Sequence, residues 1–311
     1  MAKSSRTKNR PVPSKGPARG GRPAGLFTWL AVGLVVVVVA ALVIIKVASG
    51  GSTGGGSTAF QPTDPTTFSE LTTVPASVFN TVGVTSAAVG VTPPQAVKSQ
   101  PLLTQKSSTG AKVPEVLYIG AEYCPYCAAQ RWSTIIALSR FGTWAGLGNM
   151  TSASGDIYAN TPTFTFVNAT FKSKYVAFTS VEEYKNSVNP ATKYYYTLQK
   201  PTASQTALVT KYDTPKYITG LTASEGNPIP FMDFANRFLV AGASYSPTTL
   251  TGSSRSAIAA GLSNAASPIT AAIIASANYQ TAAICSITKQ QPSAVCTSSG
   301  VKAADTSMSI K

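Results

Sequence analysis

Four cysteines are the residues in this 311-residue sequence whose type and spacing suggest chemistry. Cys124 and Cys127 lie within the segment GAEYCPYCAAQRW, and Cys285 and Cys296 lie near the end of the chain. A cysteine thiolate is both a nucleophile and a metal ligand, so the first pair can be a redox centre, half of a metal site or a plain disulfide. The sequence contains no histidine, which excludes Ser/His/Asp and Cys/His catalysis and removes the commonest zinc and iron ligand.

The residues on either side of the first pair predict a strand that leads into a helix. Residues 115–121, EVLYIGA, are apolar, β-branched and aromatic, which is typical of a buried strand. Pro125 suits the first turn of a helix, so Cys124 should lie where free N–H groups and the helix dipole stabilise a thiolate. Cys127 should lie one turn further in. We expect an exposed attacking sulfur at Cys124 and a covered resolving sulfur at Cys127, the arrangement of thiol–disulfide exchange.

The alternatives for the first pair fit the sequence less well. A metal site built from all four thiolates is conceivable, but the second pair is separated by ten residues, unlike the short spacing of zinc sites. A purely structural Cys124–Cys127 bridge would close a very small loop and stabilise little. We therefore expect a reactive pair, with no metal and no other cofactor.

The second pair, Cys285 and Cys296, is predicted to form a structural disulfide. It brackets the end of an expected helix and a polar loop that contains Pro292. A bridge that closes a loop of about 12 residues should contribute about 3 kcal/mol in the chain-entropy model. A role in relaying electrons to Cys124 and Cys127 is the alternative.

Two separate segments resemble the thioredoxin superfamily. Residues 121–127, AEYCPYC, are similar to its A-E-W-C-x-x-C motif, with Tyr123 in place of the tryptophan. The dipeptide Pro-Tyr between the cysteines is the one that glutaredoxins carry. Ile229–Pro230, followed by an expected strand, turn and strand that ends at Gly242, resembles the cis-proline element of the same superfamily.

This resemblance implies roles for individual residues. Pro230 is expected to face Cys124 and to act in catalysis together with the two cysteines. Ile229 is expected to offer its backbone to a bound peptide, and we place Tyr126 with it as a substrate-binding residue. The implied partners are thiols and disulfides of proteins or peptides.

The sequence departs from the superfamily in its acidic residues. Thioredoxins carry a buried aspartate six residues before the first cysteine, where this chain has Tyr118. Glu115 and Glu122 are nearby, and neither clearly replaces that aspartate, so the proton carrier of the exchange is unassigned. The charged residues through which glutaredoxins bind glutathione are not identifiable either.

A longer stretch, from about residue 60 to Cys296, resembles a family of uncharacterised membrane-anchored proteins of archaea and bacteria with a thioredoxin-like core. The shared segments are EVLYIGAEYCPYCAAQRW, ALSRFG, TPTFTF, SKYVAF, PFMDF, ANYQTAAIC and QPSAVC. The role of this family is not established. The resemblance implies an α/β, thioredoxin-like fold with added segments for the extracytoplasmic domain, residues 60–311.

The beginning of the chain predicts a membrane anchor. Residues 26–45 carry no charge, and a helix of that length spans roughly 30 Å, the thickness of the hydrocarbon core. A cleaved signal peptide is the alternative, but the run is longer than the usual apolar region of about 7–15 residues and no A-x-A site follows. We expect a basic tail at 1–25, a transmembrane helix at 26–46 and a Gly/Ser linker at 47–59.

The charge distribution predicts the orientation of that anchor. The net charge is +14, and seven of the 25 basic residues precede residue 23, whereas only Lys46 follows in the next fifty positions. The positive-inside rule places the N-terminus in the cytoplasm and the C-terminal domain outside, attached to the cell membrane. The remaining basic residues are spread thinly, which argues against nucleic-acid binding.

Patterns elsewhere predict further elements. Strands are expected at 163–167 and 175–179 and as a pair around a turn at 235–237, and helices are expected near 204–212 and within 247–262 and 268–287. Residues 59–115 are expected to be irregular, with one or two strands. The sequence as a whole favours a membrane-tethered, extracytoplasmic thiol–disulfide oxidoreductase; the alternative is a non-catalytic, thioredoxin-like binding or scaffold module of the cell envelope.

Overall fold

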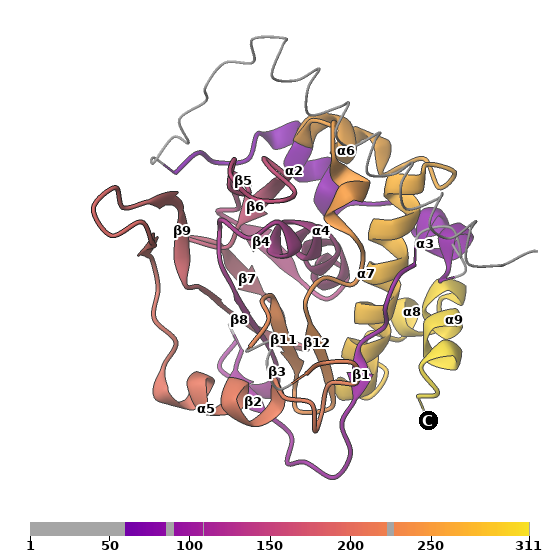
Figure 1. Cartoon of the computed structure of the whole chain (residues 1–311). Helices are drawn as coiled ribbons and strands as arrows, with labels where there is room; N and C mark the ends of the chain where they lie inside the picture. Colours follow the sequence, from indigo (N-terminus) through magenta and orange to yellow (C-terminus); the bar gives the residue numbers. More distant parts are fainter. Residues whose placement is uncertain (1–59, 85–89, 108, 223–226, 311) are drawn as a thin grey trace, which may run out of the picture. The chain divides into compact units, whose positions relative to one another are not determined.

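The computed structural model of the protein describes residues 60–84, 90–107, 109–222 and 227–310 (Figure 1). These residues belong to the second of two units into which the chain divides, Gly56–Lys311. The expected tail, transmembrane helix and linker, residues 1–59, lie outside the described residues. Within the described ranges no helix is both long enough and apolar enough to cross a membrane.

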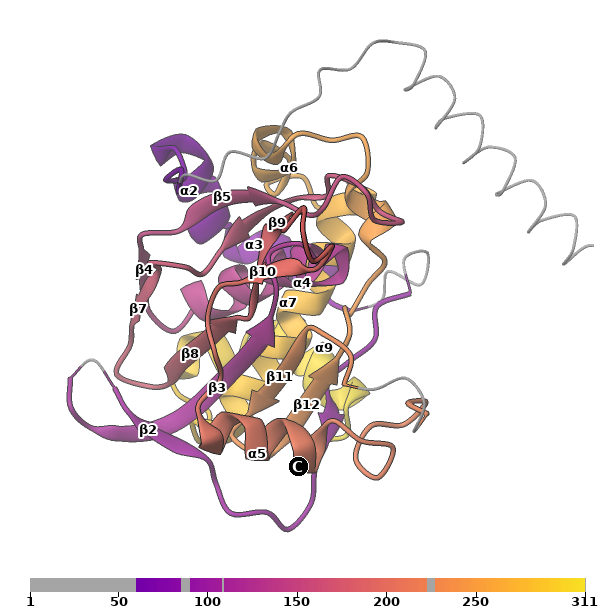
Figure 2. The same cartoon turned by 60° about the vertical axis from the view of Figure 1, so that its left-hand side comes forward.

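A mixed sheet of six strands forms the centre of the fold (Figure 2). Its order is β1-β12-β11-β3-β2, and β8 also pairs with β3. The β3–β8 pair is parallel, with Gly120 opposite Glu182, and the other pairs of the sheet are antiparallel. The strands are β1 (Gln95–Ala96), β2 (Thr104–Lys106), β3 (Lys112–Gly120), β8 (Ala177–Glu182), β11 (Phe231–Phe234) and β12 (Phe238–Ala241).

The strand predicted before Cys124 is confirmed as β3, and helices cover both faces of the sheet around it. Tyr118 faces the large core with α4 (Pro125–Ser139) and α7 (Pro268–Ile287). Leu117 faces a second, smaller cluster with Tyr212 of α5 (Ala203–Tyr212). Because successive residues of β3 are buried on opposite faces, the strand reads as the continuous apolar run that a central strand requires.

The expectation of irregular structure before β3 is wrong for two helices, α2 (Pro65–Thr72) and α3 (Ala76–Val82). Asp64 caps α2 by accepting a hydrogen bond from the N–H of Thr67 at 2.9 Å. Both helices are short and contain many Thr, Ser and Val, whose intrinsic helix propensity is low. Their stability comes from packing on the large core, through Leu71, Val78 and Phe79.

The helical expectations near 204–212 and 268–287 are confirmed by α5 and α7, and the turn at 235–237 lies between β11 and β12. Residues 247–262 form two helical pieces instead of one. The remaining elements are β4 (Thr143–Ala145), β5 (Gly148–Thr151), β6 (Pro162–Thr165), β7 (Thr170–Lys172), β9 (Tyr184–Val188), β10 (Tyr195–Thr197), η1 (Pro247–Leu250), α6 (Arg255–Gly261), α8 (Ser293–Cys296) and α9 (Ser299–Ser307).

The structure contains the disulfide between Cys285 and Cys296, with 5.6 Å between the two Cα atoms. Cys285 lies in the last turns of α7 and Cys296 ends α8. Both residues are buried in the large core, at 0% and 2% exposure. The bond therefore connects the long buried helix to the segment that leads into α9.

Candidate active site

Cys124 lies at the junction of β3 and α4, as the sequence predicts. It is the N-cap residue of α4, and its Sγ accepts a hydrogen bond from the N–H of Cys127 at 3.3 Å. Pro125 occupies the first turn, where a missing N–H costs nothing. The cap therefore uses the sulfur itself as acceptor, in the position where a serine or aspartate oxygen usually lies.

Both thiols are free, and both are buried. Cys127 has no exposed surface, and Cys124 is 5% exposed. The prediction of an exposed attacking sulfur is therefore wrong, although Cys124 is the more exposed of the two. The reason is local packing, because Tyr123 and Ile229 lie against the cluster formed by Ala121 and the two cysteines.

The structure brings the Ile229–Pro230 element to the cysteines. The peptide bond between these residues is cis, and the Cys124 thiol lies 3.6 Å from the Ile229 carbonyl oxygen, which accepts its hydrogen bond. The Pro230 carbonyl accepts from the N–H of Gly242 at 2.9 Å, which ties the element to the end of β12. Residues more than a hundred positions apart thus share one site, while the role of each in catalysis stays a prediction.

The two thiols differ in acidity. The pKa of Cys124 is lowered, first by the hydrogen bond from the Cys127 side chain and also by the Cys127 N–H and the positive charge of Arg131. The pKa of Cys127 is raised well above its usual value, mainly by burial and also by Cys124. Cys124 therefore ionises first, and Cys127 holds its proton.

A buried ion pair that the sequence analysis missed lies beneath the cysteines. Arg131, one helical turn after Cys127, donates to both carboxylate oxygens of Glu182, at 2.9 and 2.7 Å. The same guanidinium donates to the carbonyl of Ala121 at 2.7 Å. Both side chains are fully buried. The signal in the sequence is Arg131, four residues after Cys127 and the only charged residue of α4. Its partner could not be found without the β3–β8 register.

Tyr118 occupies the position where the resemblance predicts an aspartate. Its ring is fully buried and packs edge-on against Phe166 at 5.0 Å. Its hydroxyl has no hydrogen-bond partner among the described residues, and burial raises its pKa well above the ordinary value. Tyr118 is therefore a poor proton carrier at neutral pH.

Of the two glutamates noted in the sequence, Glu122 lies nearer to the cysteines. Glu115 belongs to the other end of β3, five residues and about 16 Å along the strand from Gly120. Glu122 is 7% exposed, accepts a hydrogen bond from Thr165 at 2.8 Å, and has a pKa raised mainly by burial.

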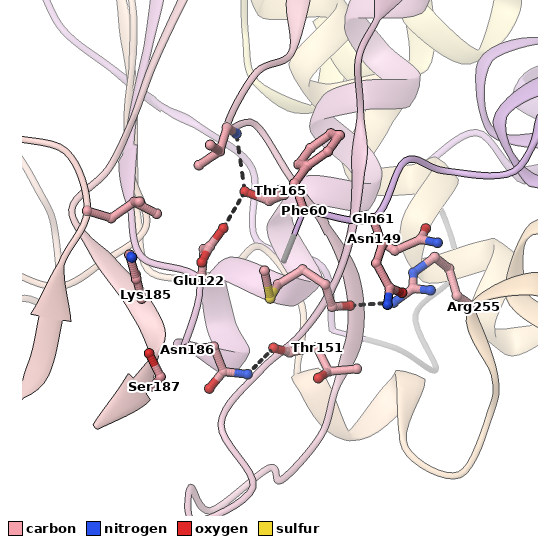
Figure 3. A pocket seen from close by; sticks show the side chains of 13 residues that line it. Phe60, Gln61, Glu122, Asn149, Thr151, Thr165, Lys185, Asn186, Ser187 and Arg255 are labelled. Carbon is pink, nitrogen blue, oxygen red and sulfur yellow. Dashed lines mark hydrogen bonds between the residues drawn. The ribbon is translucent and has the colours of Figure 1, made fainter. Parts of the chain in front are cut away.

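Glu122 also lines a cavity of about 290 Å³, shown in Figure 3. Its carboxyl group points toward Thr165, and Asn186 across the cavity donates to the Thr151 carbonyl at 2.6 Å. Arg255 holds the far wall through the carbonyl oxygens of Met150 and Thr163, each at 2.6 Å. Other lining residues are Phe60, Gln61, Asn149, Lys185 and Ser187.

The structure also bears on metal binding and on substrate contact. Among the described residues, no group of three or more His, Cys, Asp and Glu side chains could hold a metal ion. Tyr126, predicted to bind substrate, is 41% exposed between the two cysteines, and its ring contacts that of Tyr158 edge-on at 5.7 Å.

Comparisons with known proteins identify a family and no function. No curated protein and no solved structure shows significant similarity to this chain. One family model, described as a domain of unknown function (DUF929), matches residues 102–286, which is more than half of the chain. The match includes β3, Cys124, Cys127 and Ile229–Pro230. The chain therefore belongs to the DUF929 family.

Proposed function

We propose that the protein is a thiol–disulfide oxidoreductase of thioredoxin-like fold, tethered to the cell membrane and acting outside the cytoplasm. The observation that carries this proposal is the pairing of Cys124, a helix N-cap with a lowered pKa, with Cys127, a buried thiol with a raised pKa. The placement at the membrane rests on the sequence of residues 1–59 alone.

The arrangement of elements supports the thioredoxin-like assignment. β3 leads through the cysteines into α4, and β8 lies parallel to β3 on one side. After the cis Ile229–Pro230 bond, β11 and β12 form an antiparallel hairpin on the other side of β3, and α7 follows. This order of strands and helices supports the proposed thioredoxin-like core, with further segments added around it.

The proposed cycle exchanges one disulfide for another. The Cys124 thiolate attacks a disulfide of the partner, forms a mixed disulfide and releases one partner thiolate, which takes up a proton. Cys127 loses its proton, attacks the Cys124 sulfur and releases the second partner thiolate. The partner gains two electrons and two protons, and the protein becomes the Cys124–Cys127 disulfide. Run in reverse, the same steps oxidise a dithiol partner.

Two charged groups fit this cycle. The Arg131 guanidinium lowers the pKa of Cys124, so it favours the attacking thiolate. Glu122 belongs to the motif itself, is protonated more readily than an ordinary glutamate, and faces a cavity through which water can carry the proton away. We assign to Glu122 the proton that Cys127 must lose.

One observation favours a second candidate, a binding or scaffold module. Cys124 is only 5% exposed, and a sulfur that a partner cannot reach would leave the pair without exchange chemistry. In that case Cys124 and Cys127 would contribute to stability alone.

The deciding experiment measures the full chain, solubilised in detergent because of the apolar segment 26–45. We expect catalysed reduction of insulin or oxidation of a reduced peptide, and a reduction potential for Cys124–Cys127 in the range of known exchange enzymes. We also expect Cys127→Ser to trap mixed disulfides at Cys124, whereas Cys124→Ser traps none. Absence of both turnover and trapping would leave the scaffold as the function.

A further inference from the structure

A second cavity, of about 250 Å³, lies at the end of α4 that is remote from the reactive cysteines. Arg140, which lines this cavity, is the C-cap of α4, and Cys124 is the N-cap of the same helix. A helix of that length separates the two caps by about 24 Å. A ligand in this cavity would therefore occupy a site distinct from the exchange site.

Segments from both ends of the described chain form the walls of this cavity, and α3 lies beside α9 in Figure 1. The side-chain amide of Asn278 in α7 donates to the carbonyls of Phe79 and Gly83, each at 2.9 Å. The N–H of Gly300 donates to Asn80 Oδ1 at 3.2 Å. These bonds hold α3 against α7 and α9, so the fold itself shapes the cavity. Most of the wall is apolar and comes from Leu71, Val74, Ala76, Phe79, Ile136 and Val295.

The Arg140 guanidinium forms part of the same wall. Its Cζ lies 4.1 Å from the centroid of the Phe79 ring, which covers one face of the group. It donates to Asn278 Oδ1 at 3.3 Å and to Ser298 Oγ at 3.1 Å. Phe79 and Ser298 both line the cavity, so the guanidinium lies at its edge. A guanidinium has five N–H donors, and the described residues accept from only two nitrogens of Arg140.

No carboxylate compensates this positive charge within the described ranges, where the one ion pair is that of Arg131 with Glu182. Burial lowers the pKa of Arg140 to about 10, so the group is still charged at neutral pH. Arg237 and Arg255 donate to backbone carbonyls at 2.5–2.6 Å, whereas the acceptors of Arg140 are neutral side chains at longer distances. A poorly solvated charge with weak acceptors favours an anion from outside the chain.

We propose that this cavity binds a small organic carboxylic acid, with its carboxylate on Arg140 and an aliphatic or aromatic body against the apolar wall. A guanidinium matches a carboxylate because both groups are planar and can form two parallel hydrogen bonds. The volume of about 250 Å³ is below the roughly 300–1,000 Å³ of most ligand sites, which selects a small ligand. The proposal does not depend on the exchange function.

The other polar groups of the wall explain why an acid with an apolar body fits better than a phosphate. The hydroxyls of Thr72, Ser139 and Ser298 all donate to backbone carbonyls, at 2.7–2.8 Å. Arg140 is therefore the one lining side chain with N–H or O–H groups left to donate to an anion. Phosphate is strongly hydrated and needs several donors, whereas a carboxylate can be held by one guanidinium while its body replaces water at the apolar wall.

A binding experiment with the full chain in detergent tests the ligand class. Phenylacetate and hexanoate are titrated by isothermal calorimetry, and phenylacetamide and inorganic phosphate serve as the uncharged and the purely ionic probe. We expect at least one acid to saturate a single site, and both control probes to bind at least about tenfold more weakly. The amide also controls for partition into the detergent. Binding of phenylacetamide or phosphate as tight as that of the acids, or no saturation by either acid, would overturn the proposal.

Two variants locate the binding in this cavity. Arg140→Gln removes the charge but keeps an amide that can donate, and we expect it to weaken binding of the acid at least about tenfold. Because Arg140 also bonds to α7, a second variant, Ala294→Trp, fills the cavity from an exposed position of α8 and should weaken binding similarly. The matched control is Arg237→Gln, which changes an arginine that lines neither cavity and should bind the acid as wild type does. Thermal unfolding verifies the fold, and unchanged affinity in either folded cavity variant would overturn the proposal.

Discussion

The two cysteine pairs of this chain are both buried, yet one is reduced and the other is bonded. Cys124 and Cys127 lie at a helix N-terminus among polar groups, including the Ile229 carbonyl and the Arg131 guanidinium. Cys285 and Cys296 lie within the large apolar core, between α7 and α8. Burial alone therefore does not decide what a cysteine does. The difference comes from nearby donors and charges, which stabilise a thiolate at the first pair.

The largest effect on stability should come from replacing Arg131 in its buried ion pair with Glu182. Arg131→Met leaves the Glu182 carboxylate buried without its partner, and we expect it to lower the free energy of unfolding by about 3–5 kcal/mol. It should also raise the pKa of Cys124, because a positive charge that favours the thiolate is lost. Denaturant unfolding and the pH dependence of Cys124 alkylation measure the two effects.

A double variant separates stability from acidity. Arg131→Met with Glu182→Met replaces the pair by apolar side chains, so most of the lost stability should return while the pKa of Cys124 stays raised. If the double variant restores the wild-type pKa, the ion pair acts only through the fold, and its electrostatic role at Cys124 is wrong.

The second pair is predicted to affect stability alone. Replacing Cys285 and Cys296 with alanine should lower the free energy of unfolding by about 3 kcal/mol, because the unfolded chain gains freedom. The rate of disulfide exchange at Cys124 in the folded protein should not change. A loss of turnover with an intact fold would instead support the electron relay between the pairs that the sequence left open.

The sequence predicted the local parts of the first pair better than the distant ones. The strand, the cap and the helix follow from residues 115–142, because an apolar run and Pro125 act over short range. The approach of Ile229 came from the resemblance and not from any pattern in the residues. The Arg131–Glu182 pair could not be predicted, since it depends on the parallel register of β3 and β8.

The low exposure of Cys124 and the position of the β9–β10 hairpin were missed for a related reason. The β9–β10 hairpin contains Lys, Asn, Ser and Thr without clear alternation, so nothing local predicts a strand pair there. Its position beside the cysteines is set by tyrosine contacts such as Tyr123 on Tyr195. Likewise α2 and α3 depend on packing against the core and carry weak helix signals of their own.

The stability of the protein should depend on pH through carboxyl groups away from either pair. Burial raises the pKa of Asp233 to about 7, so between pH 4 and 7 the folded state binds more protons than the unfolded chain. Stability should therefore fall as pH rises through this window and level off above it. Asp233→Asn should raise the free energy of unfolding at pH 8 by about 1–2 kcal/mol, because no buried charge then forms.

Asp233→Asn removes the titration of Asp233 from the pH dependence of stability. That titration would otherwise overlap with pH-dependent changes near Cys124 and Cys127. Asparagine can still accept the hydrogen bond that the Asn236 N–H donates to Asp233 at 2.6 Å. Asp213, whose pKa burial also raises to about 7, remains, so part of the slope should persist. The check is urea unfolding at pH 5 and pH 8; a variant no more stable than wild type at pH 8 would contradict the raised pKa.

The smallest effect should come from Glu122, which precedes Cys124 by two residues. Glu122→Gln can keep the hydrogen bond from Thr165 but cannot take a proton, so resolution by Cys127 should slow about tenfold near pH 7, equivalent to about 1.4 kcal/mol of barrier. The first step, attack by Cys124, should keep its rate. Stopped-flow measurement of the mixed disulfide resolves the two phases.

The control for this substitution is Glu183→Gln, a neighbouring glutamate whose pKa burial also raises but which does not line the cavity. It should leave both phases unchanged. In the wild type, the rate of resolution should rise with pH through the raised pKa of Glu122, because only the ionised carboxylate accepts the proton, and this rise should disappear in Glu122→Gln. If resolution in Glu122→Gln keeps both its rate and its pH dependence, the Cys127 proton leaves by another route. The first cysteine pair then differs from the second only through the helix N-terminus and the charge of Arg131.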